Sequence, residues 1–232
     1  MTRVLTRLAP LAQIPPLTTH RRDLFILLTA FAVTRLFVVV IGVLSMTYLP
    51  STQGEEYTHL LDGGPALDMW YRWDAGFYAT IAIEGYDWVN EQQPTGDMAF
   101  FPLYPGLIHL VSGLTPTGCA LSPYLSTCAT LGGLLVSNVA LFAATVVLFD
   151  LVRRRFDRAT AWRAALLLLV SPISIFLSGV YTESLFLLLS LLTFWLIVRR
   201  WFLVAIAVAM LACLTRSVGV ALYPALIYIA WQ

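Results

Sequence analysis

Charged side chains are confined to a few short stretches of this 232-residue chain, and long apolar runs separate them. Runs without Asp, Glu, Lys or Arg lie between residues 97 and 150, 163 and 183, 183 and 199, 200 and 216, and after 216. Such runs are typical of membrane spans. Only 12% of the residues are charged and 59% are hydrophobic, whereas soluble domains have about 25% and about 45–50%. The composition therefore predicts an integral membrane protein and argues against a soluble enzyme, a disordered chain or a nucleic-acid-binding protein.

Six apolar segments have the composition of transmembrane helices: residues 24–48, 130–151, 164–180, 184–198, 201–214 and 218–231. A helix needs about 20 residues to cross the bilayer core, and the first two segments meet this length. The last three are shorter, so they would use flanking residues or lie where the bilayer is thinner. We therefore expect an all-α membrane protein with about six transmembrane helices, in which residues 24–232 form one transmembrane domain.

The positions of the arginines predict the orientation of these helices. All fourteen basic residues are arginines, which we interpret as the codon bias of a GC-rich bacterial genome, and hence expect a bacterial plasma membrane. Three groups precede the first segment, follow the second and follow the fourth: Arg3, Arg7, Arg21, Arg22, Arg153, Arg154, Arg155, Arg158, Arg199 and Arg200. Six crossings place all three groups on one side, which the positive-inside rule makes cytoplasmic. Residues 1–23 are then a cytoplasmic N-terminal segment.

The connection formed by residues 49–129 would lie on the extracytoplasmic side. Links between helices usually have about two to eight residues, so a loop of this length indicates a function. Between residues 55 and 97 it holds nine acidic residues and one basic residue, Arg72. Large apolar residues recur there at helical spacing and predict an amphipathic helix at the membrane surface: Trp70, Trp73, Phe77 and Ile81. The stretch 99–111 is too short to span and contains two prolines, which favours an interfacial or re-entrant segment.

Asp74 is the candidate catalytic base of this loop. A carboxylate beside the bilayer and flanked by aromatic residues is partly desolvated, which makes it a better proton acceptor. Asp is also a preferred N-cap residue, and a helix is expected to begin at Ala75. The two roles are compatible, and both stay open. Asp68 and Arg72 are four residues apart and could form a surface ion pair. Glu84 would end the same helix, followed by a glycine that stops it.

Three further ionisable residues lie within or between apolar segments. Glu183 and Arg216 each separate two apolar runs, so they either mark the water interface or face a polar cavity or a partner. Arg35 lies inside the first segment, where it must reach the interface, pair with an acid or bind a lipid phosphate. These charges do not cluster at mid-membrane as a transporter would require.

Cysteines and histidines give few further indications. Cys119 and Cys128 could form a disulfide in an oxidising compartment or remain two free thiols, while Cys213 lies in an apolar run. The three histidines have no metal-ligand spacing, and neither a P-loop nor a Gly-rich dinucleotide motif occurs. The sequence therefore does not indicate a soluble nucleotide donor.

An ordered set of short motifs runs through most of the chain, from Arg35 to Gly219. In chain order they are Arg72-Trp73-Asp74-Ala75, Tyr78, Ile81-Ala82, Glu84-Gly85-Tyr86, Phe100-Phe101-Pro102-Leu103-Tyr104-Pro105, Ser171-Pro172, Tyr181-Thr182-Glu183-Ser184 and Leu214-Thr215-Arg216-Ser217. The set resembles the PIG-V type mannosyltransferases, the GPI mannosyltransferase II family with its bacterial relatives, within the GT-C superfamily.

This resemblance implies a GT-C glycosyltransferase with a polyprenyl-phosphate sugar donor, typically mannose. The acceptor would be a lipid-linked glycan or glycolipid presented outside the cytoplasm. By the same resemblance Asp74 would be the catalytic base. Arg216 and Arg72, with Arg35 as a third candidate, would stabilise the phosphate that leaves.

The resemblance also suggests the remaining substrate-binding residues. Glu84 and Glu183 would orient hydroxyl groups or hold a divalent cation. Phe101 and Tyr104 would wall the site or contact the lipid chain, and Tyr86 is a further candidate.

The chain departs from the family pattern in two respects. Family members usually have Asn where this chain has Val218, and they are usually much longer. The alternative is therefore a truncated, non-catalytic lipid-binding or assembly module, which would work with a partner subunit.

Overall fold

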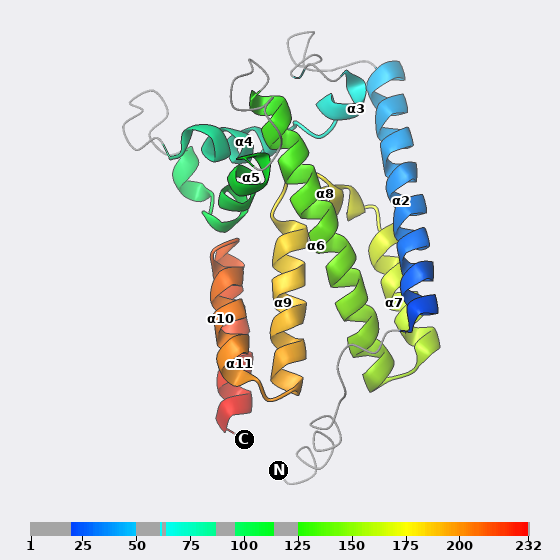
Figure 1. Cartoon of the computed structure of the whole chain (residues 1–232), viewed down its shortest axis with the longest axis vertical. Helices are drawn as coiled ribbons and strands as arrows, with labels where there is room; N and C mark the ends of the chain where they lie inside the picture. Colours follow the sequence, from blue (N-terminus) through cyan, green and yellow to red (C-terminus); the bar gives the residue numbers. More distant parts are fainter. Residues whose placement is uncertain (1–19, 50–60, 62–63, 87–95, 114–124, 232) are drawn as a thin grey trace.

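The computed structural model describes residues 20–49, 61, 64–86, 96–113 and 125–231. Every regular element in these ranges is a helix, which confirms the predicted all-α class (Figure 1). In chain order the elements are α2 (Arg21–Tyr48), α3 (Pro65–Asp68), α4 (Ala75–Glu84), the 3-10 helix η3 (Asp97–Ala99), α5 (Leu103–Gly113), α6 (Leu125–Arg155), α7 (Arg158–Val170), α8 (Ser174–Ser178), α9 (Glu183–Val198), α10 (Phe202–Cys213), the 3-10 helix η4 (Ser217–Ala221) and α11 (Leu222–Trp231).

Two of these helices, α2 and α6, are long and apolar enough to cross a membrane. Three shorter apolar stretches follow them: Glu183–Val198, Phe202–Cys213 and Ser217–Tyr228. Only 11% of the apolar window of α2 is buried inside the protein, against 44% for α6, so α2 turns most of its apolar surface outward. These helices support an integral membrane protein, while the count of six crossings stays a prediction.

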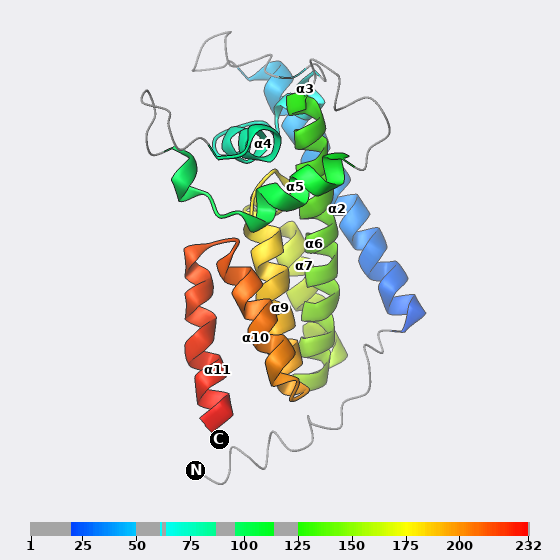
Figure 2. The same ribbon diagram turned by 60° about the vertical axis from the view of Figure 1, so that its left-hand side comes forward.

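The helices form an elongated bundle with two different ends (Figures 1 and 2). α6 runs along the length of the molecule and packs against α9, α7 and α5, and α10 packs against α9. One end, which we call the loop end, carries α3, α4 and α5 beside the start of α6. The opposite end, the arginine end, holds the start of α2, the α6–α7 turn and the α9–α10 link.

The α6–α7 turn at the arginine end consists of side chains that favour helix termini. Arg153, Arg154 and Arg155 occupy the last turn of α6, where positive charge interacts favourably with the helix dipole. Asp157 caps α7, since its carboxylate accepts hydrogen bonds from the backbone N–H and the hydroxyl of Thr160, both at 2.8 Å. The hydrogen bond from the Thr160 backbone lowers the pKa of Asp157. α6 and α7 are thus joined by a short, capped turn.

The predicted segment 164–180 is not one helix. α7 and α8 are separated by a break that contains Pro172, which lacks the N–H that a continuous helix needs. Arg35 of α2 is buried beside this break and donates hydrogen bonds to the carbonyl oxygens of Leu169 (2.6 Å) and Ser174 (2.9 Å). It also donates to the hydroxyl of Ser178. The charge inside α2 is therefore stabilised by carbonyl groups on both sides of the α7–α8 break.

The turn before α4 differs from the predicted apolar stripe. The spacing predicts one helical face for Trp70, Trp73, Phe77 and Ile81, but α4 begins only at Ala75. Trp73 has a φ of 48°, in the left-handed region, so the chain turns at this residue. Trp70 and Ile81 are consequently buried, whereas 75% of Trp73 is exposed.

α4 and α5 close the loop end of the bundle. α4 stops at Gly85 as predicted, and the φ of 83° there suits a glycine. α5 has 11 residues and runs crosswise to α6, in agreement with a segment that does not span (Figure 2). Tyr104 and Ile108 of α5 are fully buried and join Ala79 of α4 in the largest core cluster. This packing fixes α4, and with it the residues at its start.

Candidate functional site

Asp74, Tyr78, Glu183 and Arg216 converge at the loop end. They come from the start of α4, the start of α9 and the link between α10 and η4. Burial raises the pKa of the Tyr78 hydroxyl, which hydrogen-bonds to the Thr182 side chain, and the charges of Glu183, Asp74 and Arg216 also act on it. Parts of the chain that are far apart in sequence therefore share one electrostatic neighbourhood. We call these four residues the acid–arginine cluster.

Glu183 and Arg216 form an ion pair within this cluster. Arg216 donates from Nη1 to Oε1 of Glu183, and the two side chains are 40% and 31% exposed. Glu183 is the first residue of α9, where the helix dipole favours a negative charge. Its second oxygen, Oε2, is buried and has no hydrogen-bond partner among the described residues. The pair therefore combines a partly exposed guanidinium with a buried carboxylate oxygen that has no hydrogen-bond partner among the described residues.

Asp74 occupies the N-cap position of α4, as one of its two expected roles requires, yet its carboxylate makes no capping hydrogen bond. Its backbone carbonyl instead accepts the first helical bond, from the N–H of Tyr78 at 3.2 Å. The residue is exposed at the surface of the loop end, so the neighbouring aromatic residues do not bury it as the sequence had led us to expect. Its carboxylate oxygens are consequently accessible to a ligand.

Two further tyrosine hydroxyls fix the cluster to the bundle. Tyr104 is fully buried, and its hydroxyl lies 3.1 Å from the carbonyl oxygen of Gly133 and 2.7 Å from Oγ of Ser137. Tyr181 donates to the carbonyl oxygen of Arg72 at 2.9 Å. Burial raises the pKa of both hydroxyls, and nearby acidic groups raise it further. Both stay neutral in ordinary buffers and act as hydrogen-bonding groups, which leaves the carboxylates as the proton acceptors.

Aromatic rings line the α4–α5 side of the cluster. Phe100 stacks on Phe77 with ring centroids 4.8 Å apart, and Tyr78 meets the edges of both Phe100 and Tyr104, at 5.0 and 5.1 Å. Tyr86, one of the predicted substrate-binding residues, donates to the carbonyl oxygen of Phe100 at 2.8 Å. Phe100, the first residue of the aromatic-proline turn, therefore packs against the α4 side of the cluster. Phe101 lies half-buried in the same turn.

The link that carries Arg216 is tied to the aromatic-proline turn. The backbone N–H of Leu103 donates to the carbonyl oxygen of Leu214 at 3.0 Å, so the start of α5 touches the end of α10. Gly219 packs so closely that a Cβ there would lie 2.6 Å from the backbone nitrogen of Cys213. These backbone contacts position Arg216 beside α4.

Other predicted residues lie apart from the cluster. Glu84 is exposed at the far end of α4, and Arg35 is buried against the α7–α8 break. Asp68 is fully buried and accepts from the backbone N–H of Leu61 at 2.7 Å, so the expected surface ion pair with Arg72 is wrong. Arg72 itself lies half-buried in the turn before Asp74. Of the two cysteines that could form a disulfide or stay free thiols, Cys119 lies outside the described residues and Cys128 is disulfide-bonded, whereas Cys213 is a free thiol.

Sequence reasoning did not select several residues that the fold brings to the site. Trp73 packs on Phe176 of α8 with ring centroids 5.9 Å apart, and Phe176 meets Tyr181 at 5.6 Å. Ser137 joins Tyr104 to the carbonyl oxygen of Tyr181. Tyr181 belongs to the same short motif as Glu183, and this position in the motif could have identified it as a site residue. Nothing in the sequence indicated Phe176 or Ser137.

Asp74 and Glu183 are the two carboxylates that the cluster offers to a divalent cation. Among the described residues, no group of three or more His, Cys, Asp or Glu side chains is placed to hold a metal ion. The oxygen set that magnesium or calcium prefers would have to be completed by substrate or water.

The fold and the site together define an all-helical membrane protein with an acid–arginine site at one end of its bundle. Residues 63–230 match the mannosyltransferase (PIG-V) family, and the chain belongs to this family. The resemblance carried by the short motifs is thereby confirmed, and the matched range includes the whole acid–arginine cluster.

Two relatives illustrate the likeness. The chain is 37% identical over 130 residues to GPI mannosyltransferase 2 of Cryptococcus neoformans, covering 56% of this chain and 27% of that protein. It is 33% identical over 117 residues to GPI mannosyltransferase 2 of Drosophila pseudoobscura, covering 49% and 24%. The matched region thus spans about a quarter of the length of these relatives. No solved structure matches the chain significantly.

Proposed function

We propose that this protein transfers a mannose-type sugar from a polyprenyl-phosphate donor to a lipid-linked or glycolipid acceptor, as a GT-C glycosyltransferase. The observation that carries the proposal is the gathering of Asp74, Glu183 and Arg216 at one end of an apolar helical bundle. Sugar transfer from a phosphate needs a group that accepts a proton and a cation that stabilises the leaving phosphate. Membership of the PIG-V family supports mannose as the sugar, and the names of the relatives support a glycolipid acceptor.

The distribution of arginines supports an extracytoplasmic site. The arginine end carries the basic residues of the α2 start, the α6–α7 turn and the α9–α10 link. By the positive-inside rule this end faces the cytoplasm, together with the N-terminal segment. The acid–arginine cluster lies at the opposite end, so a donor and an acceptor held in the outer leaflet would both reach it.

In the proposed reaction Asp74 takes the proton of the acceptor hydroxyl. The acceptor oxygen attacks the anomeric carbon of the sugar, and a new glycosidic bond forms. The bond between that carbon and the phosphate oxygen breaks, and its electron pair leaves with the polyprenyl phosphate. Asp74 suits the role of base because it is exposed and its carboxylate is not engaged in capping α4.

Arg216 is placed to receive the negative charge of the leaving phosphate. Its side chain is 40% exposed, and among the described residues its recorded ion-pair partner is Glu183. Glu183 holds the guanidinium through Oε1 and would orient a sugar hydroxyl through the part of its side chain that is exposed. Arg72, whose carbonyl is fixed by Tyr181, would contribute a second positive charge. A divalent cation bound at Asp74 and Glu183 would supply further charge neutralisation, and no step above requires it.

The test is sugar transfer by the purified chain in lipid. The protein receives radiolabelled polyprenyl-phosphate mannose and a membrane glycolipid extract, alongside the variants Asp74→Asn and Asp97→Asn. Both variants remove one carboxylate from the same loop, but Asp97 lies in η3 and outside the cluster. We expect Asp74→Asn to lower transfer by about 10²–10⁴-fold, the usual contribution of a general base, with Asp97→Asn close to wild type.

Full transfer by Asp74→Asn would refute the assigned base. If none of the proteins transfers sugar, although each folds and binds the donor, the alternative function holds. The chain would then be a lipid-binding or assembly module that needs a partner.

A further inference from the structure

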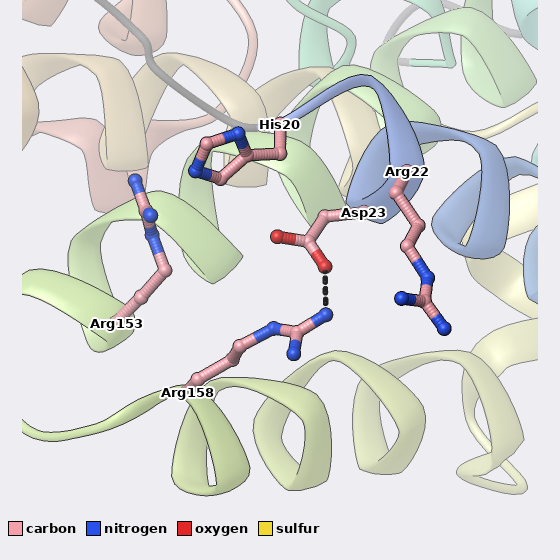
Figure 3. Close-up of a pocket in the computed structure, with 5 residues that line it drawn as sticks. All are labelled: His20, Arg22, Asp23, Arg153 and Arg158. Atoms are coloured by element: carbon pink, nitrogen blue, oxygen red, sulfur yellow. Dashed lines mark hydrogen bonds and ion pairs between the residues drawn. The ribbon is translucent and has the colours of Figure 1, made fainter.

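A cationic pocket (Figure 3) lies at the arginine end of the bundle, opposite the loop end that carries the acid–arginine cluster (Figure 1). It is a cavity of about 550 Å³ between the first turn of α2, the end of α6 and the start of α7. Its lining residues are His20, Arg22, Asp23, Arg153 and Arg158. Charged side chains from three helices therefore converge on one space that the proposed sugar transfer does not use.

Positive charge exceeds negative charge in this pocket. Its three arginines face one acid, Asp23, which is buried and accepts from Nη2 of Arg158 at 2.5 Å. Arg153 contacts the buried carboxylate of Asp150 at 3.2 Å, and Asp150 is shared with Arg154 at 2.7 Å. The acids thus hold two of the pocket arginines in place and leave the lining with a net positive charge. An anion would offset this excess.

The start of α2 adds to the attraction for an anion. His20 is the N-cap residue of this 28-residue helix, and its side chain makes no capping hydrogen bond. Arg22 and Asp23, in the first turn of α2, line the pocket, so the positive end of the helix dipole lies beside it (Figure 3). Helix starts of this kind bind phosphate when basic side chains accompany them.

The surface next to the pocket is apolar. Ile26 lies one helical turn beyond Arg22 and Asp23 on the same face of α2, and 38% of it is exposed. The apolar window of α2 is only 11% buried inside the protein. A ligand with a charged head and apolar chains would thus match both the pocket and the adjoining helix surface.

We propose that this pocket binds the phosphate headgroup of an anionic phospholipid, whose acyl chains lie along α2. Basic pockets between membrane helices recognise such headgroups, and each nearby arginine adds about 1 kcal/mol to the attraction, or about fivefold in affinity. A soluble phosphate compound has the same headgroup chemistry but no acyl chains that would contact the apolar surface of α2. The site is independent of the sugar-transfer proposal.

Lipid retention by the full chain tests the proposal. The protein is purified in detergent and mixed with phosphatidylglycerol or with phosphatidylcholine, and bound lipid is counted by native mass spectrometry. Arg22→Gln removes an exposed pocket arginine, while Arg21→Gln removes its exposed neighbour, which does not line the pocket. We expect Arg22→Gln to weaken retention of phosphatidylglycerol about fivefold and Arg21→Gln to change it less than twofold. Neither variant should alter sugar transfer.

Three results would overturn the proposal. The first is equal retention of phosphatidylglycerol and phosphatidylcholine. The second is an equal loss of binding in the two arginine variants, because general surface charge would then explain the attraction. The third is displacement of the lipid by glycerol phosphate at the same concentration, which would assign the pocket to a soluble phosphate compound.

Discussion

The hydroxyl of Tyr181 donates a hydrogen bond to the backbone carbonyl oxygen of Arg72 at 2.9 Å, across 109 residues of sequence. Tyr181 stands just before α9, and Arg72 lies in the turn that leads to Asp74. The bond therefore joins the segment that carries Glu183 to the segment that carries the proposed base.

Replacing Tyr181 by Phe should reduce sugar transfer more than folding. The variant loses one largely neutral hydrogen bond, so the free energy of unfolding should fall by about 1 kcal/mol. The turn before α4 is no longer held, and we expect the transfer rate to fall about tenfold, since a small misplacement of a catalytic group has a large effect. Thermal unfolding and transfer kinetics are compared with Tyr48→Phe, a change at a side chain that is 77% exposed. Equal effects in both variants would contradict the positioning role.

The Glu183–Arg216 ion pair should matter more for activity than for stability. Both side chains are partly exposed, so we expect a coupling free energy below about 1 kcal/mol in thermal unfolding. The same double-mutant cycle, with Glu183→Gln and Arg216→Gln, should give a larger coupling when donor affinity is measured, because Glu183 orients the guanidinium toward the phosphate. Additive effects on donor affinity would mean that the two residues act separately.

Arg35 should be a stability residue of the bundle. Arg35→Gln removes the hydrogen bonds to Leu169, Ser174 and Ser178, and the carbonyl oxygen of Ser174 then keeps the more distant Ser178 hydroxyl, at 3.4 Å, as its side-chain donor. We expect a loss of about 3 kcal/mol in the free energy of unfolding. Arg21→Gln, on the exposed first turn of the same helix, should change it by less than about 0.5 kcal/mol. Unfolding in a single detergent measures both. If Arg35→Gln unfolds like wild type but loses donor binding, Arg35 is instead a substrate contact.

Gly219 should tolerate no side chain. A Cβ there would lie 2.6 Å from the backbone nitrogen of Cys213, and a backbone atom cannot move aside as a side-chain end can. Gly219→Ala is therefore expected to destabilise the protein by about 1–3 kcal/mol and to displace Arg216. Gly106→Ala is the matched control, because a Cβ at that position meets no atom within 4 Å. Lower thermal stability and weaker donor binding should appear only in Gly219→Ala.

Features that depend on local sequence were predicted well. The apolar runs indicated the helices, Gly85 indicated the end of α4, and the arginine groups fall at one end of the bundle. The ordered motifs led to the family and to Asp74, Glu183 and Arg216, which the fold brings together.

Features that depend on tertiary contacts could not be predicted from the sequence. Trp73 takes a left-handed backbone conformation where its ring packs on Phe176, a contact between distant segments. That turn interrupts the predicted helical stripe from Trp70 to Ile81. The hydrogen-bond partners of Arg35 could not be predicted either, because they lie more than 130 residues away in the sequence.

The break between α7 and α8 and the arginine in α2 depend on each other and should be kept or replaced together. The end of α7 and the start of α8 present carbonyl groups on either side of the break at Pro172, and the guanidinium of Arg35 donates hydrogen bonds to them. Without the break, the arginine would be a buried charge without hydrogen-bond acceptors. Without the arginine, the carbonyl groups beside the break would lose a hydrogen-bond donor. A chimera that imports a continuous third helix should therefore require an apolar residue at position 35, and one that keeps the break should keep the arginine.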